Sequence, residues 1–114
     1  MINIFRDFIE ANYSYDILDV LDTYAELFNQ LGIDISDDSR VISPWTGEEL
    51  QTNLKWILLE TAQDKNIIPA DFNLIEHCDN NDPFILVGID DLDKVNRIVK
   101  AFKDWCGLTL TIDE

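Results

Sequence analysis

The segment 16–32, DILDVLDTYAELFNQLG, constrains the fold more strongly than any other part of the sequence. Its apolar residues recur every three or four positions, and at about 100° per residue they fall within one arc of roughly 120°. These residues are Ile17, Val20, Leu21, Tyr24, Leu27, Phe28 and Leu31. Gly32 follows at the position where a glycine commonly ends a helix. The segment therefore predicts an amphipathic helix that buries one side against another element.

Two further helices are expected in the first half of the chain. Residues 2–9 carry apolar side chains at helical spacing. Residues 46–49, TGEE, fit a capping box, and Trp45 with Leu50 would supply the hydrophobic staple, so a third helix is expected to start near Gly47. Its predicted buried stripe consists of Leu50, Leu54, Ile57, Leu58 and Thr61.

The segment between the second and third helices predicts a polar connection. Residues 33–45 contain three aspartates and several serines, which favour turns. A short strand at residues 40–42 is a weak expectation within it. The third helix is expected to end before Asn66 or Pro69.

After about residue 70 the pattern changes to strands. Strands are predicted at 72–76, 83–89 and 108–112, and a helix at 90–105 that Gly107 closes. The first two strands would form an antiparallel hairpin, and a right-handed crossover through the helix would place the last strand parallel to the second or close by it. The prediction is one α+β domain over residues 1–114: three helices, then a small mixed three-stranded sheet, in the order α-α-α-β-β-α-β.

The charge balance limits the classes of partner. The chain has 23 acidic and 8 basic residues, a net charge of −15, and residues 1–49 hold 11 acids against 2 bases. Nucleic acid and anionic membranes require cationic neutralisation, so neither is expected as a partner. A basic protein would be attracted. Solubility alone is the other explanation of the charge, and it stays open.

Location and redox state follow from what the sequence lacks. No apolar stretch approaches the roughly 18–20 residues that span a membrane, and the N-terminus has no signal-peptide pattern. A cytoplasmic location is therefore the default. No cofactor is expected, and a monomer is favoured, although the oligomeric state stays open. Cys78 and Cys106 do not make a disulfide framework and are expected to be reduced and partly buried.

The stretch 76–83, EHCDNNDP, is a candidate metal site because it holds the only histidine. His77 and Cys78 are adjacent, and on a strand their side chains would point to opposite faces. The stretch has no paired-ligand spacing of the zinc type. The calcium-loop pattern, with Asp79 as position one, fails because Pro83 takes the fifth position and the pattern's glycine and twelfth-position glutamate are both missing. No metal site is expected.

The sequence gives equally weak support for nucleophilic catalysis. A catalytic cysteine needs its base within hydrogen-bond reach, and neighbours on a strand do not face each other. Cys106 with His77 is geometrically possible once the chain folds. No dinucleotide, P-loop or nucleophile-elbow motif occurs. A non-catalytic protein is expected, and a small enzyme or ligand-binding domain with a site near His77 and Cys78 is the alternative.

Two charged features remain as candidate contact surfaces. The helix at 90–105 carries bases at 94, 97, 100 and 103, for which a nucleic-acid or phosphate site is one interpretation. Aspartates precede these bases, as the helix dipole favours, so a solvated face is expected instead. Acids in the helix at 16–32 have no base at i+3 or i+4, which favours a surface for a partner. A simple solvated face is the other explanation of these acids, and it stays open. The predicted partner-binding residues are therefore this helix face, the following connection and the 79–82 turn: Asp19, Asp22, Glu26, Asp34, Asp37, Asp38, Asp79 and Asp82.

The chain's size, its acidic segments 16–26 and 33–38 and its expected α+β plan resemble the immunity proteins of bacterial toxin systems, including contact-dependent growth inhibition. The resemblance implies tight binding to one cognate, basic toxin or nuclease domain in the cytoplasm. These proteins share no motif, so no residue role is carried over. Phage-encoded inhibitors of host nucleases are similar at this level, and a plain adaptor domain is a third interpretation.

Overall fold

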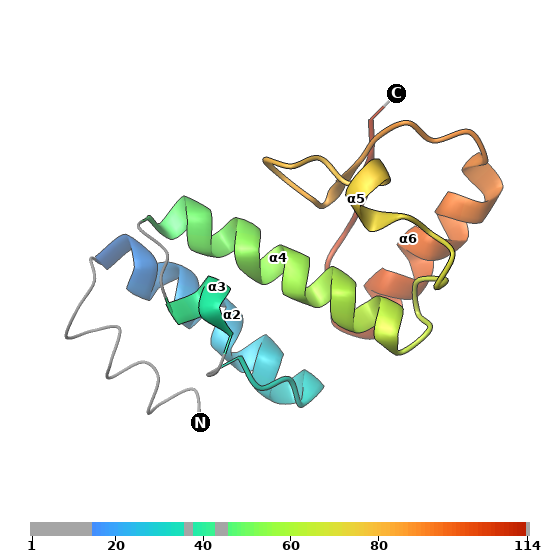
Figure 1. Ribbon diagram of the computed structural model, residues 1–114. Helices are drawn as coiled ribbons and strands as arrows, with labels where there is room; N and C mark the ends of the chain where they lie inside the picture. Colours follow the sequence, from blue (N-terminus) through green and yellow to red (C-terminus); the bar gives the residue numbers. More distant parts are fainter. Residues whose placement is uncertain (1–14, 36–37, 43–45, 114) are drawn as a thin grey trace. The chain divides into compact units, whose positions relative to one another are not determined.

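The computed structural model describes residues 15–35, 38–42 and 46–113. Helices dominate, and a small parallel sheet accompanies them, so the coarse α+β prediction is confirmed (Figure 1). The elements in chain order are α2 (Tyr15–Leu31), α3 (Ser39–Ile42), α4 (Gly47–Asp64), α5 (Leu74–His77), β1 (Ile85–Leu86), α6 (Leu92–Cys106) and β2 (Thr111–Ile112). The helix expected at residues 2–9 lies outside the described residues.

The chain divides into two compact units, Met1–Leu54 and Lys55–Glu114. The boundary falls inside α4, which Figure 1 shows as one continuous helix. The first unit therefore holds α2, α3 and the first part of α4, and the second unit holds the remainder. The prediction that residues 1–114 form one domain stays a prediction.

Helix α2 in the first unit follows the apolar pattern of its sequence. Leu21, Tyr24 and Phe28 are buried, and Val20, Leu27 and Leu31 of the same stripe are half-buried. The helix ends at Gly32, whose φ of 71° is left-handed. The amide of Gly32 donates to Asn29 O at 3.2 Å and that of Ile33 to Phe28 O at 3.0 Å, the paired bonds of a Schellman ending. The predicted helix and its terminating glycine are confirmed.

The weak strand expected at residues 40–42 is wrong, because residues 39–42 form the short helix α3. Asp38 sets this local structure. Its carboxylate accepts from the amide of Arg40 at 2.9 Å, and its carbonyl accepts from the amide of Val41 at 2.9 Å. An aspartate that bonds the following amides in this way favours the start of a helix over an extended chain.

Helix α4 begins and ends as its sequence predicts. The amide of Glu49 donates to Thr46 Oγ1 at 3.0 Å, the first half of the capping box. The expected staple residue Trp45 lies outside the described residues. After Asp64 the chain turns through Asn66 in the left-handed region (φ 62°), and the amide of Ile67 returns to Ala62 O at 2.9 Å. The buried stripe is Leu50, Leu54, Ile57, Leu58, Leu59 and Ala62; Thr61 is half-buried.

The strand predicted at 72–76 is wrong, because a turn and the helix α5 occupy that segment. Asn73 caps α5: its side chain accepts from the amide of Glu76 at 3.1 Å. The amide of Phe72 donates to Pro69 O at 3.0 Å, and Gln63 of α4 donates to Pro69 O and Phe72 O. These bonds use backbone groups that a strand would need for its ladder.

The pairing predicted for the last strand is confirmed. β1 and β2 lie parallel, with Ile85 opposite Thr111 and Leu86 opposite Ile112, and α6 forms the crossover between them. The two ordered strands are shorter than expected. Among the described residues the predicted hairpin amounts to one antiparallel bridge, Cys78 to Leu86, so the three-stranded sheet is not confirmed.

Helix α6 has a buried and a basic side. Asp91 caps its first turn by accepting from the amide of Lys94, and Gly107 ends it at φ 80°, as predicted. Val95, Ile98 and Phe102 are buried, whereas the bases at 97, 100 and 103 are exposed. The Phe102 ring meets Phe84 edge-on at 5.4 Å between centroids, which places α6 against the residue before β1.

Candidate functional site

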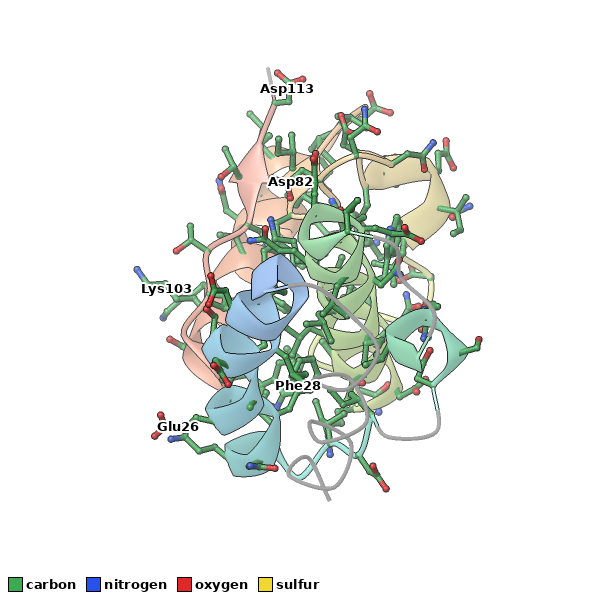
Figure 2. The ribbon with its side chains drawn as sticks, turned by 90° about the vertical axis from the view of Figure 1, so that its left-hand side faces the viewer. Glu26, Phe28, Asp82, Lys103 and Asp113 are labelled. Carbon is green, nitrogen blue, oxygen red and sulfur yellow. The ribbon has the colours of Figure 1, made fainter. Side chains whose placement is uncertain are left out.

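The exposed side of α2 is acidic. Asp19, Asp22 and Glu26 are exposed, on the side of the helix away from the buried Leu21 and Phe28. Figure 2 shows Glu26 projecting outward from α2 and Phe28 pointing inward. Helix α2 contains no lysine or arginine. The structure thus brings three predicted partner-binding residues onto one solvent-facing helix side.

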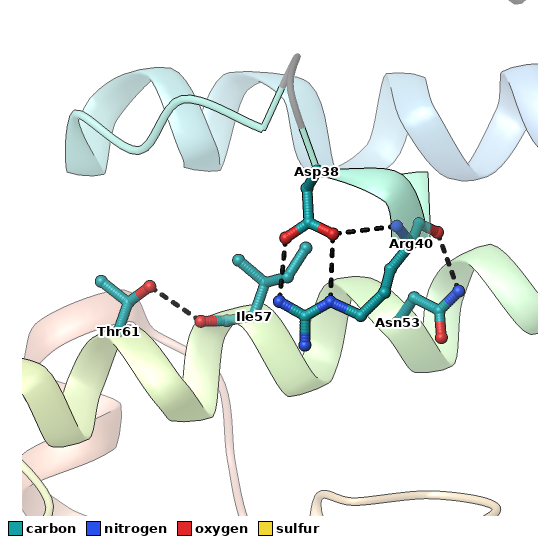
Figure 3. A network of polar contacts seen from close by, with 5 residues as sticks. All are labelled: Asp38, Arg40, Asn53, Ile57 and Thr61. Carbon is teal, nitrogen blue, oxygen red and sulfur yellow. Dashed lines mark hydrogen bonds and ion pairs between the residues drawn. The ribbon is translucent and has the colours of Figure 1, made fainter. Parts of the chain in front are cut away.

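The connection after α2 behaves differently from the prediction. Asp34 is exposed, and Asp37 lies outside the described residues. Asp38 forms a two-point ion pair with Arg40: Nε donates to one carboxylate oxygen at 3.0 Å and Nη2 to the other at 2.8 Å (Figure 3). The hydrogen bond from Arg40 lowers the pKa of Asp38 below its ordinary 3.8, against a smaller effect of burial.

Arg40 also joins α3 to α4 within the first unit. The side chain of Asn53 donates to Arg40 O at 2.8 Å (Figure 3). The same view shows Thr61, in the second unit, donating to Ile57 O one turn earlier in α4. Asp38 is thus part of a local polar network, and its charge is largely matched by Arg40.

The 79–82 turn is held by its own aspartates. Asp79 accepts from the amides of Asn81 at 2.7 Å and Asp82 at 3.4 Å. Asp82 accepts from the amide of Phe84 at 3.2 Å. The carboxylate of Asp82 also receives Lys55 Nζ at 2.9 Å, and the same ammonium lies 5.1 Å from the centre of the Phe84 ring. Lys55 therefore matches much of the charge of Asp82.

His77 and Cys78 have separate surroundings. The His77 ring stacks on Phe72 at 5.2 Å between centroids, and its Nδ1 lies 3.1 Å from Val87 O. A carbonyl only accepts, so this contact requires the proton on Nδ1. The Cys78 thiol is buried, and desolvation raises its pKa to about 12. A thiol in this environment stays protonated near neutral pH and is a poor nucleophile.

Cys106 is also a buried thiol. It donates to Phe102 O at 3.3 Å, and burial raises its pKa. Both cysteines are free, as the sequence predicts. In the described part of the chain, no three side chains of the His, Cys, Asp or Glu type are grouped so that they could hold a metal ion.

Two hollows lie on the second unit and share the segment 71–73. The first, of about 250 Å³, is lined by Asp71, Phe72, Asn73, Glu76, His77, Ile89, Asp90, Asp91, Lys94 and Val95. The second, of about 510 Å³, is lined by Trp56, Glu60, Gln63, Ala70, Asp71, Phe72, Asn73, Leu74 and Ile75. Lys94 and Asp71, which both line the first hollow, form an ion pair with 3.3 Å between Lys94 Nζ and Asp71 Oδ2.

The second hollow is the feature that sequence reasoning missed. A strand at 72–76 would alternate its side chains, whereas α5 buries Leu74 and leaves Ile75 77% exposed. The available signal was the pair Asn73 and Glu76, which has the spacing of a helix cap. Trp56 was predicted to belong to a helix, but its place beside Ile75 depends on the tertiary fold.

No family model matches this chain, and comparisons with curated proteins and with solved structures give no match. Across residues 15–35, 38–42 and 46–113, the structure contains no helix with the length and apolar character needed to cross a membrane.

Proposed function

We propose that this protein binds and neutralises a basic partner, a toxin or nuclease domain, by forming a stoichiometric complex, in the manner of an immunity protein. The observation that carries the proposal is the exposed side of α2, where Asp19, Asp22 and Glu26 lie on a helix without a basic residue. A net charge of −15 supports it, because such a field attracts cationic proteins.

The acidic face fits a partner that handles phosphates. A nuclease surface that binds nucleic acid is rich in lysine and arginine, and carboxylates can occupy the positions that phosphates would take. Charge on the rim of such a complex mainly accelerates association and sets its dependence on salt. Buried anchor residues then slow dissociation. The proposal therefore assigns the rate of encounter to α2.

The partner can be found by capture and tested by protection. The tagged full chain is used to recover proteins from its source cell at low and moderate salt. A recovered basic protein is then expressed alone and together with this chain in a test bacterium. The proposal predicts loss of growth in the first case and normal growth in the second. Equal loss of growth in both cases would contradict it.

The role of α2 is tested by removing charge without disturbing the core. The double variant Asp19→Asn/Glu26→Gln should slow association with the captured partner by about three- to tenfold at low salt. The control Asp64→Asn/Asp113→Asn makes the same change in net charge at exposed positions of the second unit. Similar association rates for both variants would show that α2 has no special part in encounter.

A second candidate function rests on the hollow of about 250 Å³ that His77 lines. A histidine beside carboxylates suits a small polar ligand or acid–base chemistry. Cys78 does not line this hollow, so only His77 carries this alternative. His77→Gln should leave an inhibitor's protection of growth unchanged. Lost protection by a folded His77→Gln protein would favour the ligand-binding alternative.

A further inference from the structure

The hollow between α4 and α5 has an exposed apolar side chain in its lining. Ile75 is 77% exposed, and Trp56, which is half-buried, lines the same hollow. Phe72 and Leu74, both mostly buried, complete the apolar lining. At about 510 Å³ the hollow falls in the size range of about 300–1,000 Å³ that holds a ligand or a large side chain.

Hydrogen bonds within the second unit connect the walls of this hollow. Gln63 on α4 donates its side-chain amide to Pro69 O at 3.0 Å and to Phe72 O at 2.7 Å. Asn73 then caps α5 and sets the position of Ile75. A binding surface held by such bonds loses little conformational entropy on association.

The charge around the hollow selects the occupant. The two neighbouring hollows share the ridge 71–73, and their linings together contain five carboxylates and one base, Lys94, which pairs with Asp71 at 3.3 Å, so the linings keep an excess of negative charge. The carboxylates are Glu60, Asp71, Glu76, Asp90 and Asp91. A second copy of a chain with net charge −15 would be repelled, as would an anionic lipid surface. Charge complementarity therefore favours a cationic protein segment as the occupant of the hollow.

We infer that the hollow lined by Trp56 and Ile75 holds an aromatic or aliphatic side chain from a lysine- or arginine-rich segment of the partner protein. This inference rests on the proposed function and names a contact surface for it. Apolar anchors that fill pockets carry most of the binding energy of an interface, while surrounding charges add specificity. Ile75 and Trp56 contact the anchor, and the carboxylates of the ridge and its flanks face the basic residues.

The inference is tested with two defined fluorescent peptides. One has arginines on both sides of a tryptophan, and the other has alanine in place of that tryptophan. The tryptophan peptide is expected to bind the full chain about tenfold more tightly, as expected for one anchor residue. In ¹⁵N NMR spectra it should shift the Trp56 indole and the Ile75 and Leu74 amide signals. Equal affinity for both peptides would overturn the inference.

Matched variants connect the affinity to this hollow. Ile75→Ser should abolish the preference for the tryptophan peptide, a loss of about tenfold. Leu92→Ser is the control, because Leu92 is the other large hydrophobic residue that is exposed in the described part of the chain, at 47%. It should retain the preference. Unchanged circular dichroism and melting temperature establish that the Ile75→Ser protein is folded.

The same variants separate this inference from the proposed function. If Ile75→Ser protects cells from the captured partner and binds it with unchanged dissociation rate, the hollow is not the docking surface and the neutralising function stands. If the wild-type chain gives no protection, the proposed function fails whatever the peptides show. Faster dissociation of Ile75→Ser by about tenfold, with Leu92→Ser unchanged, supports the inference.

Discussion

At the residue scale, Asp38 and Asp82 show how neighbours change the part that a carboxylate can play. Both were predicted to contact a partner because they lie in acidic segments. Arg40 pairs with Asp38 at 2.8 Å and Lys55 pairs with Asp82 at 2.9 Å. The sequence spacing gave no indication of the second pair, because Lys55 and Asp82 are brought together only by folding. Asp19 and Glu26 are therefore the better candidates for a partner's charges.

The ion pair between Asp38 and Arg40 makes a contribution to stability that depends on pH. A carboxyl whose pKa is lowered in the folded state stabilises the protein above its unfolded value of 3.8, and this stabilisation is lost as pH falls through the folded value. Asp38→Asn should therefore show a smaller fall in unfolding free energy than wild type between about pH 5 and pH 3. Urea titrations across this range measure it, and parallel curves for the two proteins would contradict the pairing.

Cys78 contributes at the opposite end of the pH scale. Burial raises the pKa of the Cys78 thiol from 9.0 to about 12 in the folded protein. The protonated thiol therefore makes its full contribution to the free energy of unfolding below pH 9.0, and that contribution is lost as the pH rises toward 12. Cys78→Ala should be less stable near pH 7 by roughly 1–2 kcal/mol, because it leaves a small cavity. Its stability should decline less steeply than wild type from about pH 9 to 11. An equally steep decline of stability in the Cys78→Ala and wild-type proteins would indicate that the Cys78 thiol is accessible to water.

At the element scale, helix endings follow local rules and can be tested individually. Gly32 ends α2 at φ 71°, a conformation that disfavours a side chain. Gly32→Ala should lower the unfolding free energy by about 1 kcal/mol. Asn29→Ala changes an exposed residue within α2 and should be neutral or slightly stabilising, since alanine favours helices. Thermal unfolding measures both, and an unaffected Gly32→Ala protein would contradict the left-handed ending.

Elements with their own repeating pattern were predictable, and those set by a distant side chain were not. Helices α2, α4 and α6 follow the apolar periodicity and capping residues of their sequences. The segment 72–76 reads as a strand by residue type, yet Gln63 and Asn73 bind its backbone and produce a turn and α5. The second hollow could not be predicted for the same reason. The acidic side of α2 was predictable, because it depends on that helix alone.

At the scale of the whole molecule, the net charge opposes compactness. With −15 charges the folded chain repels itself, and this repulsion is screened as salt is added. Raising sodium chloride from about 0.01 to 0.15 M should increase the melting temperature by roughly 5 °C, which corresponds to about 1 kcal/mol for a protein of this size. Sucrose at matched osmolality controls for general solvent effects. A melting temperature that falls with salt would mean that attractive ion pairs dominate.

The central claim, neutralisation by one-to-one binding, is tested most directly by titrating the captured partner's activity with this chain. The account predicts that the residual activity falls linearly and reaches its floor at one chain per partner, with no dependence on incubation time. An enzyme would inactivate many partners per chain and continue with time. Such sub-stoichiometric inactivation, or unchanged activity at molar excess, would contradict the account.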